Sequence, residues 1–428
     1  MSGEPVVDLM RAEWNGRAEE DANYYVAFGR KNQSQEEFFD SGADVVRALE
    51  MEMKRRPPEF WPKASALEIG CGPGRLMKPM SRHFGEIHGV DIAEEMIHRA
   101  RQNLAGAPNV RLHHVEDSSL SEFPGESFDF IYSYAVFQHI PSRDIVMSYL
   151  EHAVRVLRKG GLFVFQISGL PDQGHQQTTW NGVRISAEEI IAFARRMGVL
   201  LLQLNDRDTQ YMWVTLQKPG WEIGAVKASS IRKIANAYTG ERAIPSSGRF
   251  GAASIWIENL PDQADLLSLS AKVNGEEALG CYVSPVINRL RFYNILIPAG
   301  TRTGFAEVDL LQNGEPLCPR SWARITRPGP RVPRVVSVTD GVNLISSLRI
   351  ETGLVKMVME ELVEPARIRI GVAGCAIPYE SFCVNPLHER YEFNFYLPKE
   401  LSPGLHNLQI TLDGLGFAPV PIHVSRAA

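Results

Sequence analysis

The chain has 428 residues, of which 44% are hydrophobic and 22% charged; 45 basic and 50 acidic side chains give a formal net charge of −5. At roughly 150 residues per domain, this length predicts about three domains. The composition is that of an ordinary globular protein with enough apolar material for buried cores. The balanced charge excludes a protein that binds nucleic acid through a strongly basic surface.

Neither membrane insertion nor secretion is indicated. The best apolar run, residues 199–202, is far shorter than the roughly 18 residues needed to cross a bilayer. Residues 1–5 lack the basic region and apolar segment of a signal peptide. The five cysteines form no CxxC pair and are odd in number, which is typical of free thiols in a reducing compartment. We therefore expect a cytoplasmic protein, and no metal-ligand motif is recognised.

The first half of the chain, residues 1–220, alternates strand-like and helix-like segments. Apolar residues between the strands recur at three- and four-residue steps, for example at Ile145, Tyr149 and Val156. This alternation predicts an α/β domain with a parallel sheet and helices on both faces. The last two strands are expected to form an antiparallel hairpin at one edge. The seven expected strands are Ala66–Ile69, Ile87–Asp91, Val110–Val115, Phe128–Ser133, Leu162–Ile167, Val199–Leu204 and Tyr211–Leu216.

Beyond residue 225 the helical period nearly vanishes, and strand-like runs separated by Pro, Gly and Asn take over. Their spacing of about 10 to 15 residues predicts two all-β sandwich domains. We place these domains at 226–328 and 333–428, with a proline-rich linker at 327–333. The expected strands are Ala253–Glu258, Leu266–Val273, Leu290–Ile297, Ala306–Leu311, Ile368–Val372, Tyr391–Leu397 and His406–Leu412.

The β half repeats itself at a spacing of 100 residues. The segment 294–298 returns at 394–398, Asn313-Gly314 returns as Asp413-Gly414, and Pro319 returns as Pro419. Several short matches at one spacing indicate tandem domains of about 100 residues. These domains loosely resemble immunoglobulin-like domains of the IPT/TIG type, and the opening of the second, residues 333–338, looks like the first strand of such a domain.

The candidate ligand-binding residues cluster around a glycine-rich turn. Residues 66–75, ALEIGCGPGR, read as a strand that runs into this turn and then into a helix. Such a turn at the carboxyl end of a central strand is where open α/β sheets bind ligands. The spacing GxGxG, with an acid two residues before the first glycine, differs from the GxGxxG of dinucleotide sites. Asp91 ends the second strand, where a carboxylate can accept hydrogen bonds from a ribose, and Asp117 follows the third.

This string resembles the class I S-adenosylmethionine-dependent methyltransferases of the small-molecule type, over about residues 60–217. The resemblance implies a Rossmann-like, seven-stranded domain at 1–220, with lid helices within 1–60, and S-adenosylmethionine as cofactor. It implies that Gly70, Gly72 and Gly74 line the methionyl part of the cofactor, in a loop that Glu68 supports. It also implies that Asp91 binds the ribose and that Ile92 packs on the adenine face, with Asp117 and Ser118 at the adenine edge. Tyr134 and Ala135 are implied to lie near the sulfonium. Lys159 departs from the family's usual proline, outside the cofactor pocket. The implied cofactor-binding residues are Glu68, Gly70, Cys71, Gly72, Gly74, Arg75, Asp91, Ile92, Asp117, Ser118, Tyr134 and Ala135.

Simpler roles remain open for some of these residues. Glu68 also fits a residue that caps the following turn, and Asp91 fits a helix N-cap, which is compatible with ribose binding. Cys71 lies inside the glycine loop without a neighbouring base or a paired cysteine. We therefore interpret Cys71 as a small filler residue rather than a nucleophile.

His139 is the candidate general base. It follows the fourth strand, in a loop that in this fold faces the transferred methyl group. A hydroxyl acceptor gains from a base of near-neutral pKa, although positioning alone supplies much of the rate of a methyl transfer. The alternative is that His139 hydrogen-bonds the backbone and shapes the loop.

Two segments are candidates for binding the acceptor. The first is N-terminal and aromatic-rich, and in it Arg17, Tyr24 and Tyr25 are expected to close over the cofactor carboxylate. The alternative is that Trp14 and Phe28 of this segment pack a helix onto the sheet. The second is the polar loop 169–184, because a loop of this length is usually functional or disordered. Its candidate residues are His175, Trp180 and Asn181.

Two hypotheses of function follow. In the first, the protein is a methyltransferase that acts on a hydroxyl or amine of a small molecule or glycan. In the second, it is a cofactor-binding scaffold whose β domains bind a protein or carbohydrate partner, or a second copy of the chain. The complete set of glycines and acids favours the first. Aminopropyl transfer would require further acids near an amine, and no such cluster is recognised.

Overall fold

The computed structural model describes residues 4–27, 34–172, 174, 177–220, 228–248, 250–329, 332–341, 348–385 and 389–425. The chain forms two compact units. One comprises Met1–Ala22 and Gln35–Pro328, and the other comprises Asn23–Ser34 and Gly329–Ala428. The first unit therefore holds the α/β part together with the first of two β regions.

The α/β part is built on a twisted sheet in the order β3-β2-β1-β4-β5-β7-β6. Strands β1 to β5 are parallel, and β7 is antiparallel to both β5 and β6. The sheet is nearly continuously apolar because both of its faces are covered. Its strands are β1 (Ser65–Ile69), β2 (Glu86–Asp91), β3 (Val110–His114), β4 (Phe128–Ser133), β5 (Leu157–Ile167), β6 (Leu200–Asn205) and β7 (Met212–Gln217).

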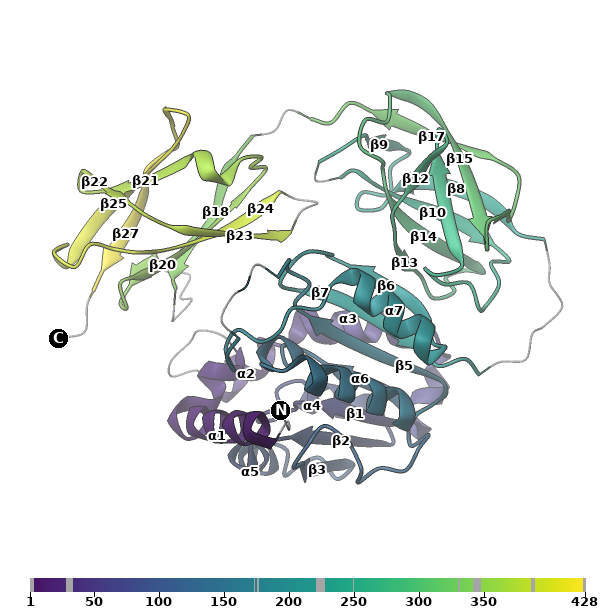
Figure 1. Ribbon diagram of the computed structural model, residues 1–428, viewed down its shortest axis with the longest axis horizontal. Helices are drawn as coiled ribbons and strands as arrows, with labels where there is room; N and C mark the ends of the chain where they lie inside the picture. The colour runs from purple at the N-terminus through teal and green to yellow at the C-terminus, as the bar shows by residue number, and fades with distance from the viewer. Residues whose placement is uncertain are drawn as a thin grey trace. The chain divides into compact units, whose positions relative to one another are not determined.

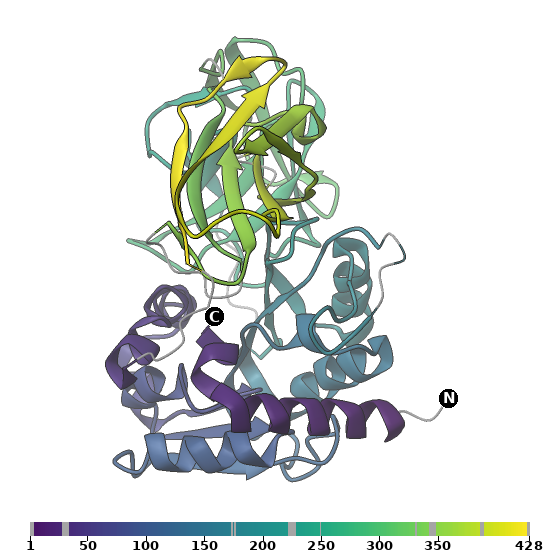
Figure 2. The same ribbon diagram turned by 90° about the vertical axis from the view of Figure 1, so that its left-hand side faces the viewer.

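Helices pack on both faces of this sheet. The helices are α1 (Glu4–Ala27), α2 (Gln35–Asp40), α3 (Ala43–Met53), α4 (Met77–Met80), α5 (Glu94–Asn103), α6 (Arg143–Val156) and α7 (Ala187–Met197), with 3₁₀ turns η1 (Pro58–Lys63), η2 (Ser81–His83) and η3 (Phe137–His139). One core joins α6 and α7 to the sheet, and another joins α3, α4 and α5 to the opposite face (Figure 1). Figure 2 shows the bend of α1, the long purple helix, near Asp21. Within the described residues, no helix is long and apolar enough to span a bilayer.

Local sequence explains where α6 and α7 begin. Ser186 caps α7: its hydroxyl accepts from the Glu189 N–H, and the Glu189 carboxylate accepts from the Ser186 N–H. Gly198 ends α7 in the left-handed conformation, with a φ of 62°. Ser142 caps α6 by accepting from the Ile145 N–H at 3.4 Å. These caps fix the helices that cover one face of the sheet.

Each of the seven expected strands is present in the α/β part. β5 begins at Leu157, five residues before the expected start, because Gly160 and Lys218 extend its pairing with the segment after β7. β6 and β7 form the expected antiparallel hairpin. The hairpin does not end the sheet, however, because β13 (Gly280–Val283) of the first β region pairs with β6 through Tyr282 and Gln203. The sheet therefore continues from the α/β part into the first β region.

The first β region consists of two sheets around one hydrophobic core. Its remaining strands are β8 (Ser230–Asn236), β9 (Ala243–Pro245), β10 (Ala252–Glu258), β11 (Leu269–Val273), β12 (Glu276–Ala278), β14 (Leu290–Leu296), β15 (Gly304–Gln312), β16 (Glu315–Pro316) and β17 (Ser321–Thr326). One sheet runs β13-β14-β10-β8 and continues the α/β sheet. The other runs β12-β11-β15-β17-β9, with β16 beside β15.

The second β region contains strands and one 3₁₀ turn, η4 (Pro365–Arg367), drawn yellow-green in Figures 1 and 2. Its strands are β18 (Arg334–Asp340), β19 (Arg349–Ile350), β20 (Leu354–Glu360), β21 (Ile368–Val372), β22 (Cys375–Ile377), β23 (Glu380–Asn385), β24 (Arg390–Tyr396), β25 (Gly404–Leu412), β26 (Leu415–Gly416) and β27 (Val420–Val424). They form the sheets β18-β20-β24-β23 and β22-β21-β25-β27-β19, with β26 beside β25. Both all-β regions therefore share one strand order.

Matching turns accompany this matching order. Asn313 and Gly314 connect β15 to β16 with φ values of 51° and 85°, and Asp413 and Gly414 connect β25 to β26 with 51° and 84°. Two positive φ values characterise the type I′ turn, which favours Asn-Gly and Asp-Gly because these residues tolerate the left-handed region. The repeated dipeptides in the sequence thus occupy the same hairpin turn in both regions.

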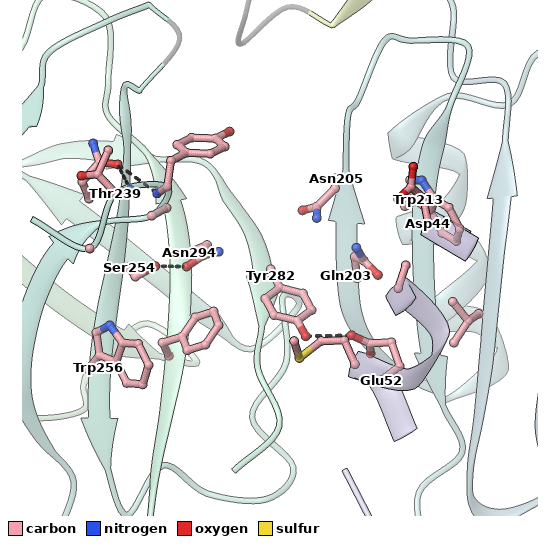
Figure 3. Close-up of a pocket in the computed structure, with 18 of the residues that line it drawn as sticks. Asp44, Glu52, Gln203, Asn205, Trp213, Thr239, Ser254, Trp256, Tyr282 and Asn294 are labelled. Atoms are coloured by element: carbon pink, nitrogen blue, oxygen red, sulfur yellow. Dashed lines mark hydrogen bonds between the residues drawn. The ribbon is translucent and has the colours of Figure 1, made fainter. Parts of the chain in front are cut away.

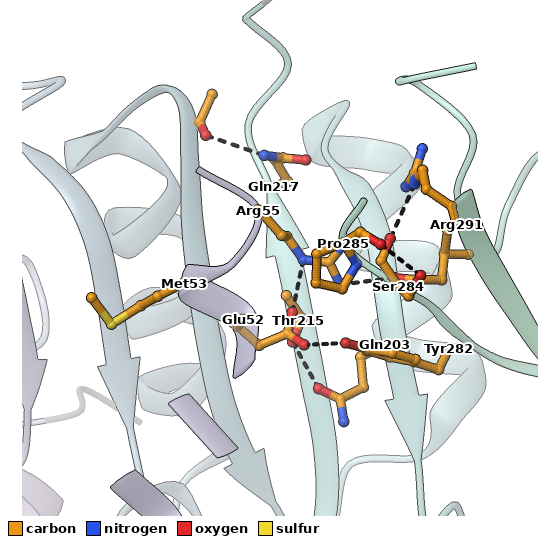
Figure 4. Close-up of polar contacts among 12 residues, drawn as sticks. Glu52, Met53, Arg55, Gln203, Thr215, Gln217, Tyr282, Ser284, Pro285 and Arg291 are labelled. Carbon is orange, nitrogen blue, oxygen red and sulfur yellow. Dashed lines mark hydrogen bonds and ion pairs between the residues drawn. The ribbon is translucent and has the colours of Figure 1, made fainter. Parts of the chain in front are cut away.

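A buried polar cluster joins the α/β part to the first β region (Figure 4). Tyr282 on β13 donates its hydroxyl proton to the Glu52 carboxylate of α3 at 2.7 Å. Arg55 bonds the other Glu52 oxygen at 2.9 Å and donates to the Val283 carbonyl at 2.8 Å. Glu52 is only 3% exposed, so its charge depends on these partners. Nearby, the Leu201 N–H donates to a carboxylate oxygen of Asp265 at 3.0 Å.

This cluster predicts a stability effect for Tyr282→Phe. The variant keeps the ring but leaves a buried Glu52 oxygen without its donor, so we expect a loss of about 1–3 kcal/mol in the free energy of unfolding. Urea denaturation followed by tryptophan fluorescence measures the loss. Tyr396→Phe is the control, because the Tyr396 ring is 72% exposed. Equal stability of the two variants would contradict a structural role for the cluster.

Candidate functional site

The glycine loop, residues 70–75, leaves the carboxyl end of β1 and leads into α4. Gly70, Gly72 and Gly74 have φ values of 72°, 51° and 88°, in the left-handed region that favours glycine. A Cβ atom on Gly70 would lie 2.3 Å from a methyl carbon of Val136, in the segment after β4. Glycine is thus required at this position by both backbone conformation and close approach.

Asp91, at the end of β2, holds the loop in place. One of its carboxylate oxygens accepts from the Gly72 N–H at 2.9 Å, and the other accepts from the Ala93 N–H at 2.9 Å. Burial raises the pKa of Asp91 above its usual value, while these two backbone bonds act in the opposite direction. Each carboxylate oxygen retains a lone pair that can accept from a ligand hydroxyl.

Two buried side chains with ionisable groups flank the glycines of the loop: Glu68 precedes them and Arg75 follows them. Glu68 accepts from the Tyr132 hydroxyl at 2.9 Å, and burial raises the pKa of Glu68 to about 8, so this carboxyl group is protonated at neutral pH. Arg75 is 7% exposed and donates only weakly, at 3.4 Å, to the carbonyl and hydroxyl of Ser41. Its buried Nε has no hydrogen-bond partner, and within the described residues no carboxylate lies within ion-pair distance of Arg75.

The other expected cofactor residues lie around the carboxyl ends of the neighbouring strands. Ile92 is buried, and Cys71 is buried with a thiol whose pKa is raised by burial, so the thiol is protonated and poorly nucleophilic. The Ser118 hydroxyl donates to the hydroxyl of Ser148 at 2.9 Å. Asp117 is largely exposed, and its pKa is lowered by hydrogen bonds first from the Ser119 side chain and then from the Ser119 N–H, which lies 2.7 Å away.

Tyr134 and Ala135 follow β4 directly. The Arg75 guanidinium lies 5.6 Å from the centre of the Tyr134 ring, so Tyr134 is next to the glycine loop. Ala135 has a φ of 57°, which is unusual for a residue with a Cβ atom and is often found at functional sites. The fully buried Gln166 of β5 holds it by accepting from the Ala135 N–H at 3.1 Å. Sequence reasoning missed Gln166, although a lone amide in the apolar run 162–167 was a usable signal.

His139 ends the 3₁₀ turn η3 and is buried, with 5% of its surface exposed. Its Nδ1 lies 2.8 Å from the Trp180 carbonyl, so Nδ1 carries the proton, and its Nε2 lies 3.3 Å from the Gln138 amide nitrogen. Burial lowers the pKa of His139 to about 4, so the ring is neutral at pH 7. These contacts are the ones that the loop-shaping alternative requires, and the base role stays a prediction.

The structure brings Arg17 and Trp180 close to His139. The Arg17 guanidinium lies 4.6 Å from the Trp14 ring centre and 5.6 Å from that of Trp180, and it donates to the Thr179 hydroxyl at 2.8 Å. The same guanidinium pairs with Glu13 at 3.1 Å.

The remaining candidates for acceptor binding make local contacts. The Asn181 N–H donates to the Thr178 hydroxyl at 3.0 Å. Tyr24 and Tyr25 contact each other edge to face at 5.1 Å in the last turns of α1. His175 and Phe28 lie outside the described residues. The roles assigned to these residues stay predictions.

With this geometry in place, comparison with known proteins identifies the α/β part. Residues 67–165 match the family model described as a methyltransferase domain. This segment is therefore similar to a methyltransferase domain. The match covers β1 to most of β5, including the glycine loop and Asp91, and it supports S-adenosylmethionine as the cofactor. It ends well before the β regions and gives no support to their immunoglobulin-like character or to the scaffold hypothesis.

Curated relatives match the methyltransferase domain over short stretches. The chain is 39% identical over 97 residues to the ubiquinone biosynthesis O-methyltransferase of Sinorhizobium fredii, covering 22% of this chain and 38% of that protein. It is 25% identical over 174 residues to phosphoethanolamine N-methyltransferase 2 of Caenorhabditis elegans, covering 39% of each. The chain spans less than two-fifths of the length of these two relatives.

Among solved structures, the geranyl diphosphate C-methyltransferase of Streptomyces coelicolor matches with a TM-score of 0.38 and 14% identity, over 50% of this chain and 98% of that one. A phosphoethanolamine N-methyltransferase of Haemonchus contortus matches with a TM-score of 0.37 and 16% identity, over 51% of this chain and 50% of that one.

The lowered pKa of His139 predicts how stability depends on pH. Between its ordinary pKa of 6.5 and about 4, the unfolded chain binds a proton that the folded chain does not, so stability falls as the pH falls through this window. The single-site loss from pH 7.5 to pH 5 is about 2 kcal/mol. His139→Gln removes this contribution while keeping a donor for the Trp180 carbonyl.

Urea unfolding at both pH values measures the difference between wild type and His139→Gln. His98→Gln is the control, because it replaces an exposed histidine instead of a buried one. Parallel pH dependences of wild type and His139→Gln would show that His139 is not held neutral in the folded protein.

Proposed function

We propose that the protein is an S-adenosylmethionine-dependent methyltransferase that acts on a hydroxyl or amine of a small molecule. The observation that carries the proposal is the arrangement of the Asp91 carboxylate, which bonds the loop amide of Gly72 and faces the start of α5. It places a ligand-accepting acid and the glycine loop at the carboxyl ends of adjacent parallel strands, where α/β sheets bind ligands.

The residues present fit the cofactor. Arg75 is a buried cation with an unpartnered Nε, and a cofactor carboxylate is the counter-ion that it lacks. We infer that Asp91 accepts from the ribose hydroxyls, that Ile92 packs on the adenine and that Asp117 and Ser118 lie at its edge. When bound, S-adenosylmethionine would supply an electrophilic methyl group on a sulfonium for transfer to the acceptor.

The chain's own contribution is mainly to position the reactants. Gln166 fixes Ala135 in its left-handed conformation, and Ala135 with Tyr134 is proposed to border the methyl group. Rate comes from holding the acceptor in line with the breaking bond, which requires no proton shuttle of its own. The neutral His139 is proposed to act on this segment by fixing its loop through the Trp180 carbonyl.

The proposal is tested by incubating the full chain with S-adenosylmethionine carrying a labelled methyl group and with cell extract fractions. Incorporation of label into a small molecule supports it, and the absence of cofactor binding in calorimetry would remove it.

Arg75→Met is expected to weaken cofactor binding. The variant keeps the volume of the buried stem but loses a charge-assisted bond of about 1.5–3 kcal/mol, which corresponds to a Kd roughly 10- to 150-fold higher. Calorimetric titration with S-adenosylhomocysteine measures this change. Arg82→Met is the matched control, since Arg82 is an exposed arginine nearby that donates to the Pro79 carbonyl. An unchanged Kd in Arg75→Met would contradict the role given to Arg75.

A further inference from the structure

A cavity of about 880 Å³ lies between the methyltransferase domain and the first β region, within the first compact unit. One wall comes from α3 and from the ends of β6 and β7, and the other comes from β8, β10, β13 and β14 (Figure 3). Tyr134 lines it, and Tyr134 also contacts Arg75 of the glycine loop. The cavity therefore opens beside the place where the methyl group is proposed to lie, and its size is that of a small-molecule site.

Aromatic rings line both walls. On the methyltransferase side, Trp213 stacks on Tyr134, with ring centres 5.6 Å apart and planes inclined by 25°. On the opposite wall, Trp256 of β10 and Phe292 of β14 form a tilted pair with centres 4.8 Å apart, and both are partly exposed. Flat apolar faces of this kind suit the carbon–hydrogen face of a pyranose ring.

Uncharged polar groups lie between these rings. The Gln203 carbonyl oxygen accepts from the Thr215 hydroxyl at 2.8 Å, whereas its NH₂ group has no hydrogen-bond partner among the described residues. The Asn205 side chain, within the same described part of the chain, makes no hydrogen bond. The Asn294 oxygen accepts from Ser254, which leaves its NH₂ group facing the cavity (Figure 3). Amides offer donors and acceptors side by side, as adjacent sugar hydroxyls require.

The charges of the lining disfavour an anionic acceptor. Lys233 is the cation among the lining residues, against the carboxylates of Asp44 and Glu52, and no arginine is among them. Glu52 is already satisfied by Arg55 and Tyr282. A phosphate or carboxylate is normally bound by several cationic donors, most often arginine.

We propose that this cavity binds a neutral oligosaccharide and presents one of its hydroxyl groups for methylation. The inference rests on the proposed methyltransferase function and makes the first β region part of the acceptor site. In the transfer, a sugar hydroxyl oxygen forms a bond to the methyl carbon, the methyl–sulfur bond breaks to leave a neutral thioether, and the hydroxyl proton passes to water.

Saturation-transfer difference NMR on the full chain tests the inference without relying on turnover. The probes are maltotriose, cellotriose and mannotriose, with phosphoethanolamine and catechol as rival acceptors, all in the presence of S-adenosylhomocysteine. We expect saturation transfer to at least one oligosaccharide. In Trp256→Ala and Asn205→Leu, we expect the Kd for that oligosaccharide to be at least tenfold higher than in wild type. Trp322→Ala is the control, because Trp322 is a 56% exposed tryptophan of the same β region outside the cavity lining.

Binding of S-adenosylhomocysteine, measured by calorimetry on each variant, shows that the fold is intact and separates the two proposals. If it binds and only phosphoethanolamine or catechol is saturated, the oligosaccharide assignment is overturned. The same holds if no probe is saturated, or if oligosaccharide binding survives in Trp256→Ala and Asn205→Leu. If S-adenosylhomocysteine does not bind to wild type while variant-sensitive oligosaccharide binding persists, the methyltransferase proposal fails and the cavity assignment stands.

Discussion

The buried contact between Glu52, Arg55 and Tyr282 is the interaction on which the first unit depends. A carboxylate that is 3% exposed is stable only while both of its donors stay in place, and these donors come from the turn after α3 and from β13. The pairing of β13 with β6 lies alongside this cluster. Together they extend the sheet of the α/β part into the first β region. The first β region thereby forms one wall of the cavity beside the glycine loop.

The cofactor side of the site depends on interactions other than this buried cluster. Its loop depends on backbone conformation, because three glycines adopt positive φ values and Gly70 has no room for a Cβ atom beside Val136. Its charges are arranged for a ligand: among the described residues Arg75 has no counter-ion, whereas burial keeps Glu68 protonated with a pKa of about 8. A zwitterionic ligand with hydroxyl groups meets these needs together, which is why we connect the loop with S-adenosylmethionine.

Local patterns in the sequence predicted most of the α/β fold and the glycine loop. The seven strands of the methyltransferase domain, the β6–β7 hairpin and the glycine loop are encoded within short segments, whose apolar spacing and turn residues are readable directly. The continuation of the sheet beyond β6 was not predictable, because Gln203 and Tyr282 are far apart in sequence and neither carries a pairing signal. The cavity was missed for the same reason, since Asn205, Trp256 and Asn294 meet only through that pairing.

Hydrogen–deuterium exchange, compared with and without S-adenosylhomocysteine, tests whether the glycine loop and its neighbours bind the cofactor. We expect slower exchange at the amides of residues 70–75, at 91–93 and at 134–135, because these backbone segments border the proposed cofactor site at the ends of β1, β2 and β4. We expect no change within 348–385. Unchanged exchange in all three segments, or protection confined to the second β region, would show that the cofactor does not bind at this site.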